Sequence, residues 1–244
     1  MLFRSWETKG NRIVSGSLDR SIKIWNTESE ECEATLLGHT DSVWCVQWST
    51  DNARIASSSK DKTVRIWCSS TGKELKCLTG HEGSVYSVAW EGGTESRLCT
   101  GATDNSIRIW DTTTGNCLQT LDGHKDWIRD VHWGLCGTIL SASADHTIRV
   151  WTSVDGRIKC QQVLMGHADC CWSVSMSRDS RYAVSGSTDS TVKVWNLGRY
   201  VSSVLGCPRR TLVIFLTLHV KFQRCVRTYV KRSHWTSLVG QLGV

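Results

Sequence analysis

Residues 54–67 read RIASSSKDKTVRIW and contain two short strand-like runs joined by a polar turn. The second run alternates polar and apolar side chains from Thr63 to Ile66, as a strand with one buried face does. Within the stretch, Trp67 follows Asp61 by six residues and Ser57 by ten. The stretch therefore predicts a β-hairpin in which a hydroxyl residue, an aspartate and a tryptophan hold fixed positions.

The same three positions recur five times along the chain. Tryptophan holds the last of them at intervals of 42, 43, 41 and 44 residues: Trp25, Trp67, Trp110, Trp151 and Trp195. An aspartate stands six residues before each one: Asp19, Asp61, Asp104, Asp145 and Asp189. A hydroxyl residue stands four residues earlier still: Ser15, Ser57, Thr100, Ser141 and Ser185. Gly-His pairs end at His39, His81, His124 and His167 with the same period. A repeat of this size cannot cover its own apolar faces, so copies must stack, and radial stacking gives a β-propeller.

Over residues 1–198 this pattern resembles the WD-repeat (WD40) propeller family, whose repeats open with Gly-His and end with Trp-Asp. Only Trp110-Asp111 keeps the literal Trp-Asp ending. The resemblance implies an all-β fold of four-stranded antiparallel blades. One partial repeat and four full repeats give about five blades here, whereas the family usually closes its ring with seven. The incomplete ring predicts exposed sheet faces, which favour either aggregation or pairing with another chain that completes the ring.

Each full repeat contains His, Ser or Thr, and Asp, the residue types of a hydrolytic triad, but a nucleophile is needed only once and these sets recur. A structural role is therefore expected. The indole N–H can donate to the hydroxyl, the hydroxyl to the imidazole, and the imidazole to the carboxylate. The family is known for such tetrads. The predicted sets are His39, Ser57, Asp61 and Trp67; His81, Thr100, Asp104 and Trp110; His124, Ser141, Asp145 and Trp151; His167, Ser185, Asp189 and Trp195; and a partial set without histidine, Ser15, Asp19 and Trp25.

The strand after each Gly-His pair contains the candidate binding residues. Apolar residues stand four, seven and nine positions after the histidine and should be buried between blades. The spacing of three predicts an irregular start of the strand that turns positions three and five to the rim of the central channel. In the family these positions and the residue before the tetrad aspartate resemble the peptide-binding top face. They are Ser42, Trp44, Lys60, Ser84, Tyr86, Thr103, Trp127, Arg129, Ala144, Cys170, Trp172 and Thr188. The alternative is that the aromatic residues are ordinary packing residues.

The composition of the chain limits which other functions and cellular locations are expected. The chain has 12 cysteines but no Cys-x-x-Cys pair, so we expect no metal site, no cofactor, and mostly buried cysteines that act as small apolar residues. The longest apolar run, 211–220, is about half the ~20 residues of a membrane-spanning helix. No signal segment or glycosylation sequon is present. We expect a cytoplasmic or nuclear protein that is not an enzyme and does not enter the membrane.

Residues 199–244 form a tail of another kind. They contain 8 basic and no acidic residues, which leaves a net charge of −2 for residues 1–198 out of the total of +6. The tail is interpreted either as a chance extension or as a basic segment that binds RNA or acidic partners through Arg209-Arg210 and Lys231-Arg232. The leading hypothesis is a non-catalytic scaffold that docks proteins or peptides on the top face. The alternative is an RNA-binding or ribonucleoprotein component.

Overall fold

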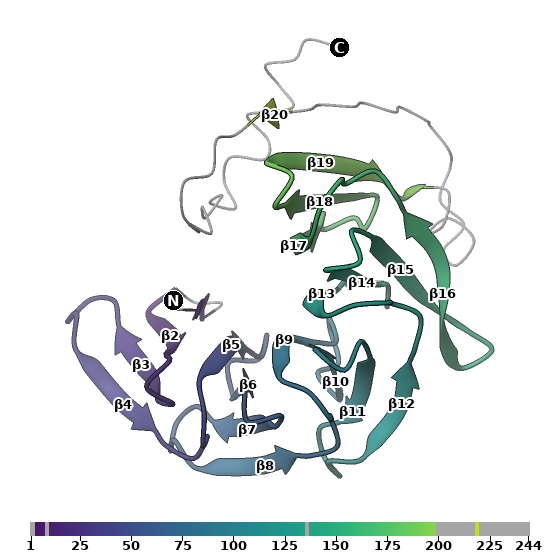
Figure 1. Cartoon of the computed structure of the whole chain (residues 1–244). Coiled ribbons are helices and arrows are strands. Elements are labelled where there is room, and N and C mark those ends of the chain that lie inside the picture. The colour runs from purple at the N-terminus through teal and green to yellow at the C-terminus, as the bar shows by residue number, and fades with distance from the viewer. Residues whose placement is uncertain (1–2, 8–9, 135–136, 199–217, 220–244) are drawn as a thin grey trace.

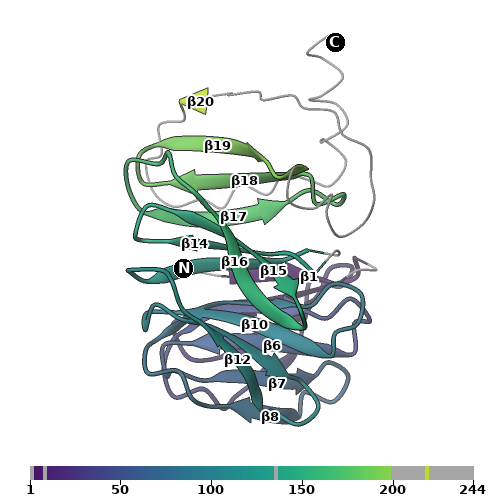
Figure 2. The same cartoon turned by 90° about the vertical axis from the view of Figure 1, so that its right-hand side faces the viewer.

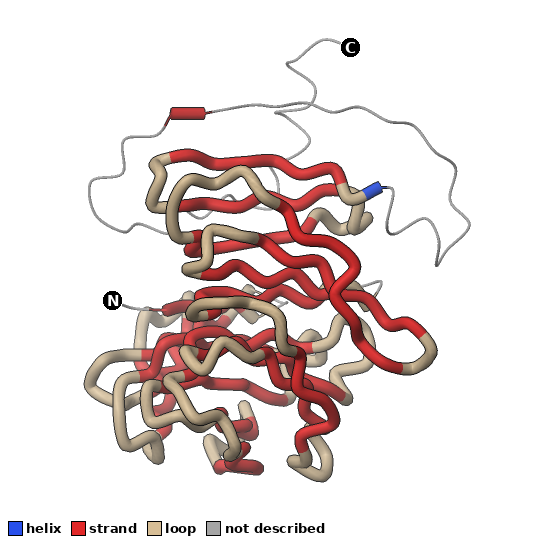
Figure 3. The backbone as a smooth tube through the Cα atoms, turned by 45° about the vertical axis from the view of Figure 1, so that its right-hand side comes forward, coloured by secondary structure: helices blue, strands red, loops and turns tan. Residues whose placement is uncertain are grey.

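The computed structural model describes residues 3–7, 10–134, 137–198 and 218–219. They form five four-stranded antiparallel sheets, which confirms the predicted all-β propeller of about five blades. The blades follow one another along an arc, with blade 1 and blade 5 at its two ends (Figure 1). Strands and loops account for nearly all of the described chain (Figure 3).

The strands have the following bounds. Blade 1 contains β1 (Phe3–Trp6), β2 (Arg12–Gly16), β3 (Ile22–Asn26) and β4 (Cys32–Leu36). Blade 2 contains β5 (Val43–Trp48), β6 (Arg54–Ser59), β7 (Val64–Cys68) and β8 (Glu74–Leu78). Blade 3 contains β9 (Val85–Trp90), β10 (Arg97–Ala102), β11 (Ile107–Asp111) and β12 (Cys117–Leu121). Blade 4 contains β13 (Ile128–Trp133), β14 (Ile139–Ser143), β15 (Ile148–Val154) and β16 (Arg157–Leu164). Blade 5 contains β17 (Cys171–Met176), β18 (Tyr182–Ser187), β19 (Thr191–Asn196) and the two-residue β20 (Leu218–His219).

Period-two side-chain alternation explains why each strand has two different faces. In β2, Val14 and Gly16 point to one face of the sheet, and Ile13 and Ser15 to the other. We call the face that meets the next blade along the chain the forward face, and the face that meets the preceding blade the rear face. Figure 2 shows the sheets edge-on, with β17, β18 and β19 above the strands of blade 4.

The apolar cores lie between blades rather than within them. The forward face of blade 1, with Ile22 and Ile24, packs against Val43 and Val46 on the rear face of blade 2 in one buried cluster. Three further clusters join blade 2 to blade 3, blade 3 to blade 4, and blade 4 to blade 5. Among the described residues, five blades thus enclose four cores.

Close contact between blades requires a small residue on the forward face of β2 and β10. A Cβ atom added at Gly101 would lie 2.5 Å from Ile128 Cγ2 in blade 4. At Gly16 it would lie 2.6 Å from Val43 Cγ1 in blade 2. These glycines therefore set how closely the first strand of the next blade can approach.

The first strand of a blade begins irregularly, as its spacing predicts. The pairing register with the second strand shifts between Val43 and Cys45, and at the matching place in blades 3, 4 and 5. Positions four, seven and nine after the histidine are 0–5% exposed in blades 2, 3 and 4. Met176 in blade 5 is the exception, since it is only half-buried.

The expectation that most cysteines are buried is wrong. Of the nine described cysteines, only Cys45, Cys99 and Cys171 are buried. Cys32 and Cys117 are exposed because they open the outermost strand of their blades, where the sheet edge faces solvent. No helix among the described residues is long and apolar enough to cross a membrane. The tail residues Arg209, Arg210, Lys231 and Arg232 lie outside the described residues.

Candidate functional site

The structure brings the four residues of each full predicted set into one chain of hydrogen bonds. In blade 2, Trp67 Nε1 donates to Ser57 Oγ at 2.8 Å, and Ser57 Oγ lies 2.8 Å from His39 Nε2. His39 Nδ1 lies 2.7 Å from Asp61 Oδ2. The same three contacts span 2.7–2.9 Å in the other three sets. The histidine precedes the first strand and the aspartate lies in the turn after the second, so each chain ties these two loops together.

Each tetrad aspartate also accepts hydrogen bonds from the backbone. Asp61 Oδ2 accepts the amide of Thr40 at 3.0 Å, and Oδ1 accepts the amide of Thr63 at 2.9 Å and its hydroxyl at 2.7 Å. Burial of the Asp61 carboxyl opposes ionisation, but the hydrogen bonds from His39 and Thr63 outweigh it and hold its pKa well below the ordinary value. The pKa values of Asp104, Asp145 and Asp189 are lowered through the same balance.

The imidazole of His124 is neutral in this arrangement. Burial disfavours the imidazolium form and lowers the pKa of His124 below its ordinary value, although the hydrogen bond to Asp145 partly offsets this. A neutral imidazole with Nδ1 protonated donates to the carboxylate and accepts from the Ser141 hydroxyl at Nε2. This proton arrangement continues the chain of hydrogen bonds without an unpaired donor.

These pKa values predict how stability depends on pH. The unfolded chain takes up a proton at His124 near its ordinary pKa of about 6.5, whereas the folded chain resists it, so stability falls as pH drops below that value. The tetrad aspartates add a second loss below about pH 4, because their folded pKa values are lowered. Urea midpoints measured from about pH 8 to pH 3 should therefore decline in two stages. A midpoint that stays constant down to about pH 5 would contradict the buried neutral state of His124.

The partial set in blade 1 lacks the histidine that links its two ends. Trp25 Nε1 still donates to Ser15 Oγ at 2.8 Å. Asp19 is exposed, and its Oδ1 accepts the amide of Ser21 at 2.9 Å and the hydroxyl of Ser21 at 2.6 Å. The two halves of the set are therefore separate in blade 1.

A backbone hydrogen bond joins the predicted top-face residues within each blade. The amide of the residue before the tetrad aspartate donates to the carbonyl of the residue three positions after the histidine. The pairs are Lys60 to Ser42, Thr103 to Ser84, Ala144 to Trp127 and Thr188 to Cys170, at 2.8–2.9 Å. The hydroxyl of Ser84 also donates to the Lys60 carbonyl of the preceding blade at 3.4 Å. Eight of the twelve predicted positions thus form four linked pairs around the same end of the blades.

The residues five positions after each histidine form a row that crosses four blades. The rings of Trp44 and Tyr86 stack with centroids 5.2 Å apart. Arg129 comes next, with its guanidinium carbon 4.7 Å from the Tyr86 centroid and 4.3 Å from that of Trp172. Trp127 covers the same guanidinium, with its ring centroid 4.8 Å from the guanidinium carbon. We call Trp44, Tyr86, Trp127, Arg129 and Trp172 the aromatic row.

The members of the aromatic row differ in how much of each side chain is exposed to solvent. Trp127 and Trp172 are 44% and 45% exposed, whereas Trp44 and Tyr86 are half-buried between their neighbours. Trp172 is also held by a hydrogen bond from its Nε1 to Thr188 Oγ1 at 2.7 Å. The accessible part of the row therefore consists of two large, oriented aromatic rings beside a cation.

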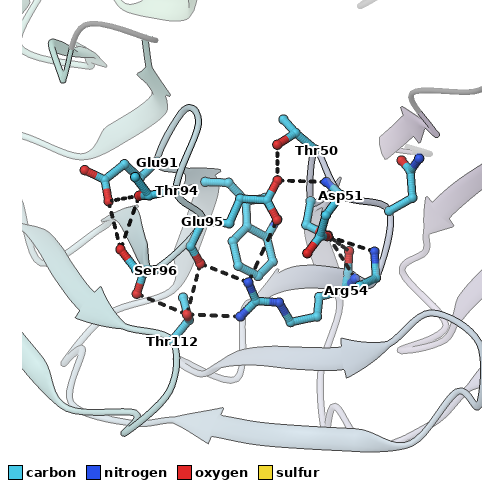
Figure 4. A network of polar contacts seen from close by, with 12 residues as sticks. Thr50, Asp51, Arg54, Glu91, Thr94, Glu95, Ser96 and Thr112 are labelled. Carbon is cyan, nitrogen blue, oxygen red and sulfur yellow. Dashed lines mark hydrogen bonds and ion pairs between the residues drawn. The ribbon is translucent and has the colours of Figure 1, made fainter.

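Sequence reasoning missed a polar network at the opposite end of the blades, where blade 2 meets blade 3 (Figure 4). The buried Glu95 accepts hydrogen bonds from the hydroxyl of Thr50 and from the amide of Asp51. Arg54 donates to the Glu95 carbonyl and to Thr112 Oγ1, both at 3.0 Å. The sequence does contain a signal for this region. In three repeats an arginine stands three residues before the tetrad hydroxyl residue, and this arginine stacks on the tryptophan that ends the first strand of the next blade. The stacked pairs are Arg12 on Trp48, Arg54 on Trp90 and Arg97 on Trp133.

Asp130 is a second feature that the sequence reading missed. Its buried carboxylate accepts the hydroxyl of Ser87 in blade 3 at 2.8 Å, and the hydroxyl of Ser173 and the amide of Val174 in blade 5 at 3.0 Å. Asp130 therefore links three consecutive blades. Within the described part of the chain, no group of three or more His, Cys, Asp or Glu could hold a metal ion.

A comparison with protein-family models matches all five repeats. A family model described as "WD domain, G-beta repeat" matches residues 5–26, 30–68, 72–111, 115–152 and 158–196. Cell division control protein 4 of Candida albicans is 41% identical over 63 residues, which are 26% of this chain and 9% of that protein. F-box/WD repeat-containing protein 7 of Drosophila melanogaster is 53% identical over 38 residues, 16% of this chain and 3% of that protein. Small ribosomal subunit protein RACK1 of Dictyostelium discoideum is 36% identical over 70 residues, 27% of this chain and 21% of that protein.

Proposed function

The chain belongs to the WD-repeat family, whose members generally serve as non-catalytic scaffolds for protein–protein interaction, and we propose from this premise that it docks peptides or proteins on its top face. The observation that carries the proposal is the exposure of Trp127 and Trp172 beside Arg129. We also propose that the chain itself catalyses no reaction. The matched relatives are covered over at most 21% of their length, so their own partners are not transferred to this chain.

Binding energetics support the aromatic row as the contact site. Tryptophan, tyrosine and arginine are the residue types that most often dominate binding, because they bury much area for each torsion that becomes fixed. Here Trp172 is already fixed by Thr188 and by stacking on Arg129, which lowers the entropy lost on binding. The guanidinium and the ring faces together suit a peptide with apolar side chains next to a polar or charged one.

The tetrads contribute to this function as supports. They tie the loop before the first strand to the turn that contains Lys60, Thr103, Ala144 or Thr188, and these residues border the row. We therefore assign the tetrads to stability and the aromatic row to binding. The proposal places the chain in the cytoplasm or nucleus, where its nine free described cysteines would stay reduced.

The test compares a double variant of the row with a matched control. Peptides are selected from a random phage-displayed library on the wild-type chain, and their affinities are measured by fluorescence anisotropy. The Trp127→Ala/Trp172→Ala variant should bind them at least about 30-fold more weakly, as loss of a binding hot spot predicts. The Leu75→Ala/Leu118→Ala variant, altered at two exposed leucines on outer strands, should bind as the wild type does.

Two outcomes would contradict the proposal. One is a folded double variant, judged by its melting curve, that binds every selected peptide with wild-type affinity. The other is a wild-type chain that selects no peptide but binds single-stranded RNA, which would favour the ribonucleoprotein alternative.

A further inference from the structure

Four residues of the aromatic row are the extra residues of β-bulges. In β13 the pairing with β14 passes over Arg129, which has no partner residue on that strand. Trp44, Tyr86 and Trp172 hold the same place in β5, β9 and β17. A bulge leaves its extra residue outside the ladder of backbone hydrogen bonds. Pairing within a blade therefore does not fix the orientation of these four side chains.

The residues directly after three of these bulge residues are joined to one another across the blades. They are Ser87 after Tyr86, Asp130 after Arg129, and Ser173 after Trp172. Asp130 Oδ1 accepts the Ser87 hydroxyl at 2.8 Å, and Oδ2 accepts the Ser173 hydroxyl at 3.0 Å. The backbone takes part as well, because Oδ2 accepts the amide of Val174 at 3.0 Å. One carboxylate thus connects β9, β13 and β17 beside the bulges.

Only a side chain with two acceptor atoms can make this connection. A carboxylate has lone pairs on both oxygens, so it can accept hydrogen bonds from the preceding and the following blade at once. Cys45, Ser87 and Ser173 hold the position of Asp130 in the other blades, and each has a single polar atom in its side chain. Asp130 is also buried, and hydrogen bonds to an ionised carboxylate are about twice as strong as those between neutral groups.

The stacking of Arg129 depends on the spacing of the same three strands. Its guanidinium carbon lies 4.7 Å from the ring centroid of Tyr86 in blade 3 and 4.3 Å from that of Trp172 in blade 5. The carboxylate of Asp130 sets the distance between these strands one residue away from the stacked groups. A row that is already ordered loses less entropy when a peptide binds.

We propose that Asp130 is a positioning residue of the binding site, which holds Tyr86, Arg129 and Trp172 in their stacked arrangement before a peptide arrives. This inference rests on the proposed function of the aromatic row. It goes beyond that function, because it assigns control of the affinity to a buried residue that lies outside the row and does not contact the peptide.

The first test measures the surroundings of Trp172 without any peptide. The chain is labelled with 5-fluorotryptophan, and the fluorine NMR resonance of Trp172 is assigned with the Trp172→Phe variant. Asp130→Ala should shift or broaden this resonance. Glu95→Ala is the matched control, because it removes a buried carboxylate that joins blades 2 and 3 at the opposite end of the blades. It should lower the unfolding midpoint and leave the Trp172 resonance unchanged.

The second test measures affinity for the peptides selected on the wild-type chain, at a temperature at which every variant is folded. Asp130→Ala should bind them about tenfold more weakly, because the row must be ordered during binding. Asp130→Asn keeps the shape, and its amide can accept from Ser173 and donate to Ser87. It should bind within about threefold of the wild type. The Glu95→Ala chain should bind as the wild type does.

A milder pair of variants serves where Asp130→Ala does not fold. Ser173→Ala removes one of the two hydroxyl donors to Asp130 and should move the Trp172 resonance in the same direction by a smaller amount. Ser175→Ala changes an exposed serine two residues further along β17 and should leave the resonance where it is.

Three results would overturn the inference. The first is a folded Asp130→Ala chain that keeps the wild-type Trp172 resonance or the wild-type affinity. The second is equal weakening of binding by Asp130→Ala and Glu95→Ala, which would attribute the effect to lost stability. The third is an Asp130→Asn chain that binds as weakly as Asp130→Ala, which would attribute the effect to the charge rather than to the links between strands.

Failure of this inference can be told apart from failure of the proposed function. Wild-type affinity in Asp130→Ala together with lost affinity in Trp127→Ala/Trp172→Ala would leave the row as the binding site and remove Asp130 from it. Wild-type affinity in the double variant would instead reject the row itself.

Discussion

Replacing Trp110 with alanine is expected to lower the free energy of unfolding by about 4 kcal/mol. The side chain is 1% exposed and belongs to the core between blades 2 and 3. Its Nε1 donates to Thr100 Oγ1 at 2.9 Å, and its ring lies 6.0 Å from that of His81. The substitution therefore leaves a cavity and also removes the donor at one end of the tetrad. Urea denaturation followed by far-ultraviolet circular dichroism measures the loss.

Trp25→Ala is the matched control for this prediction. Trp25 makes the same hydrogen bond to Ser15, but it is only half-buried because no described blade covers the rear face of blade 1. Its loss should be clearly smaller than that of Trp110. Equal losses for the two variants would contradict the conclusion that the stabilisation comes from the core between blades.

Asp104→Ala is expected to cost about 3 kcal/mol, because several buried donors lose their acceptor at once. The carboxylate accepts from His81 Nδ1 at 2.8 Å, from the amides of Glu82 and Ser106 at 3.0 Å, and from the Ser106 hydroxyl at 2.7 Å. These bonds tie the loop that enters β9 to the turn between β10 and β11. The midpoint of thermal or urea unfolding should fall accordingly.

Asp19→Ala tests whether the stabilisation depends on the hydrogen bond between the aspartate and the histidine. Asp19 holds the same position in blade 1, but it has no histidine partner and is exposed. The Asp19→Ala chain should unfold close to the wild-type midpoint. An unchanged unfolding midpoint for the Asp104→Ala chain would contradict the assignment of the tetrads to stability. It would instead favour a role for these residues in binding or chemistry.

The regular part of the fold could be predicted from the sequence, because it depends on local periodicity. The interval between Trp67 and Trp110 indicated one blade for each repeat, and alternation in the 63–67 segment located β7 within one residue. The spacing of three between Val43 and Val46 predicted the irregular start of β5. These features need only the covalent chain and the geometry of a strand.

The burial of positions four, seven and nine between blades could be predicted, but the polar and aromatic contacts between blades could not, because they depend on the distance between residues about one repeat apart. Arg129 stacks on Tyr86 and Trp172 only when three blades meet at the observed angle. Asp130 reaches both Ser87 and Ser173 for the same reason. The exposure of Cys32 and Cys117 was misjudged because the sequence pattern does not distinguish the outermost strand of a blade from the inner ones.

The position of the cores between blades has a consequence for how the protein folds during its synthesis. The forward face that contains Ile22 and Ile24 is complete once blade 1 has been translated, but its cover, β5, ends only at Trp48. Every blade therefore stays incompletely packed until the first strand of the next blade has been translated. Folding thus lags behind translation by part of a repeat. An apolar sheet face is present on the nascent chain at each stage of elongation, which is the kind of surface that chaperones shield from aggregation.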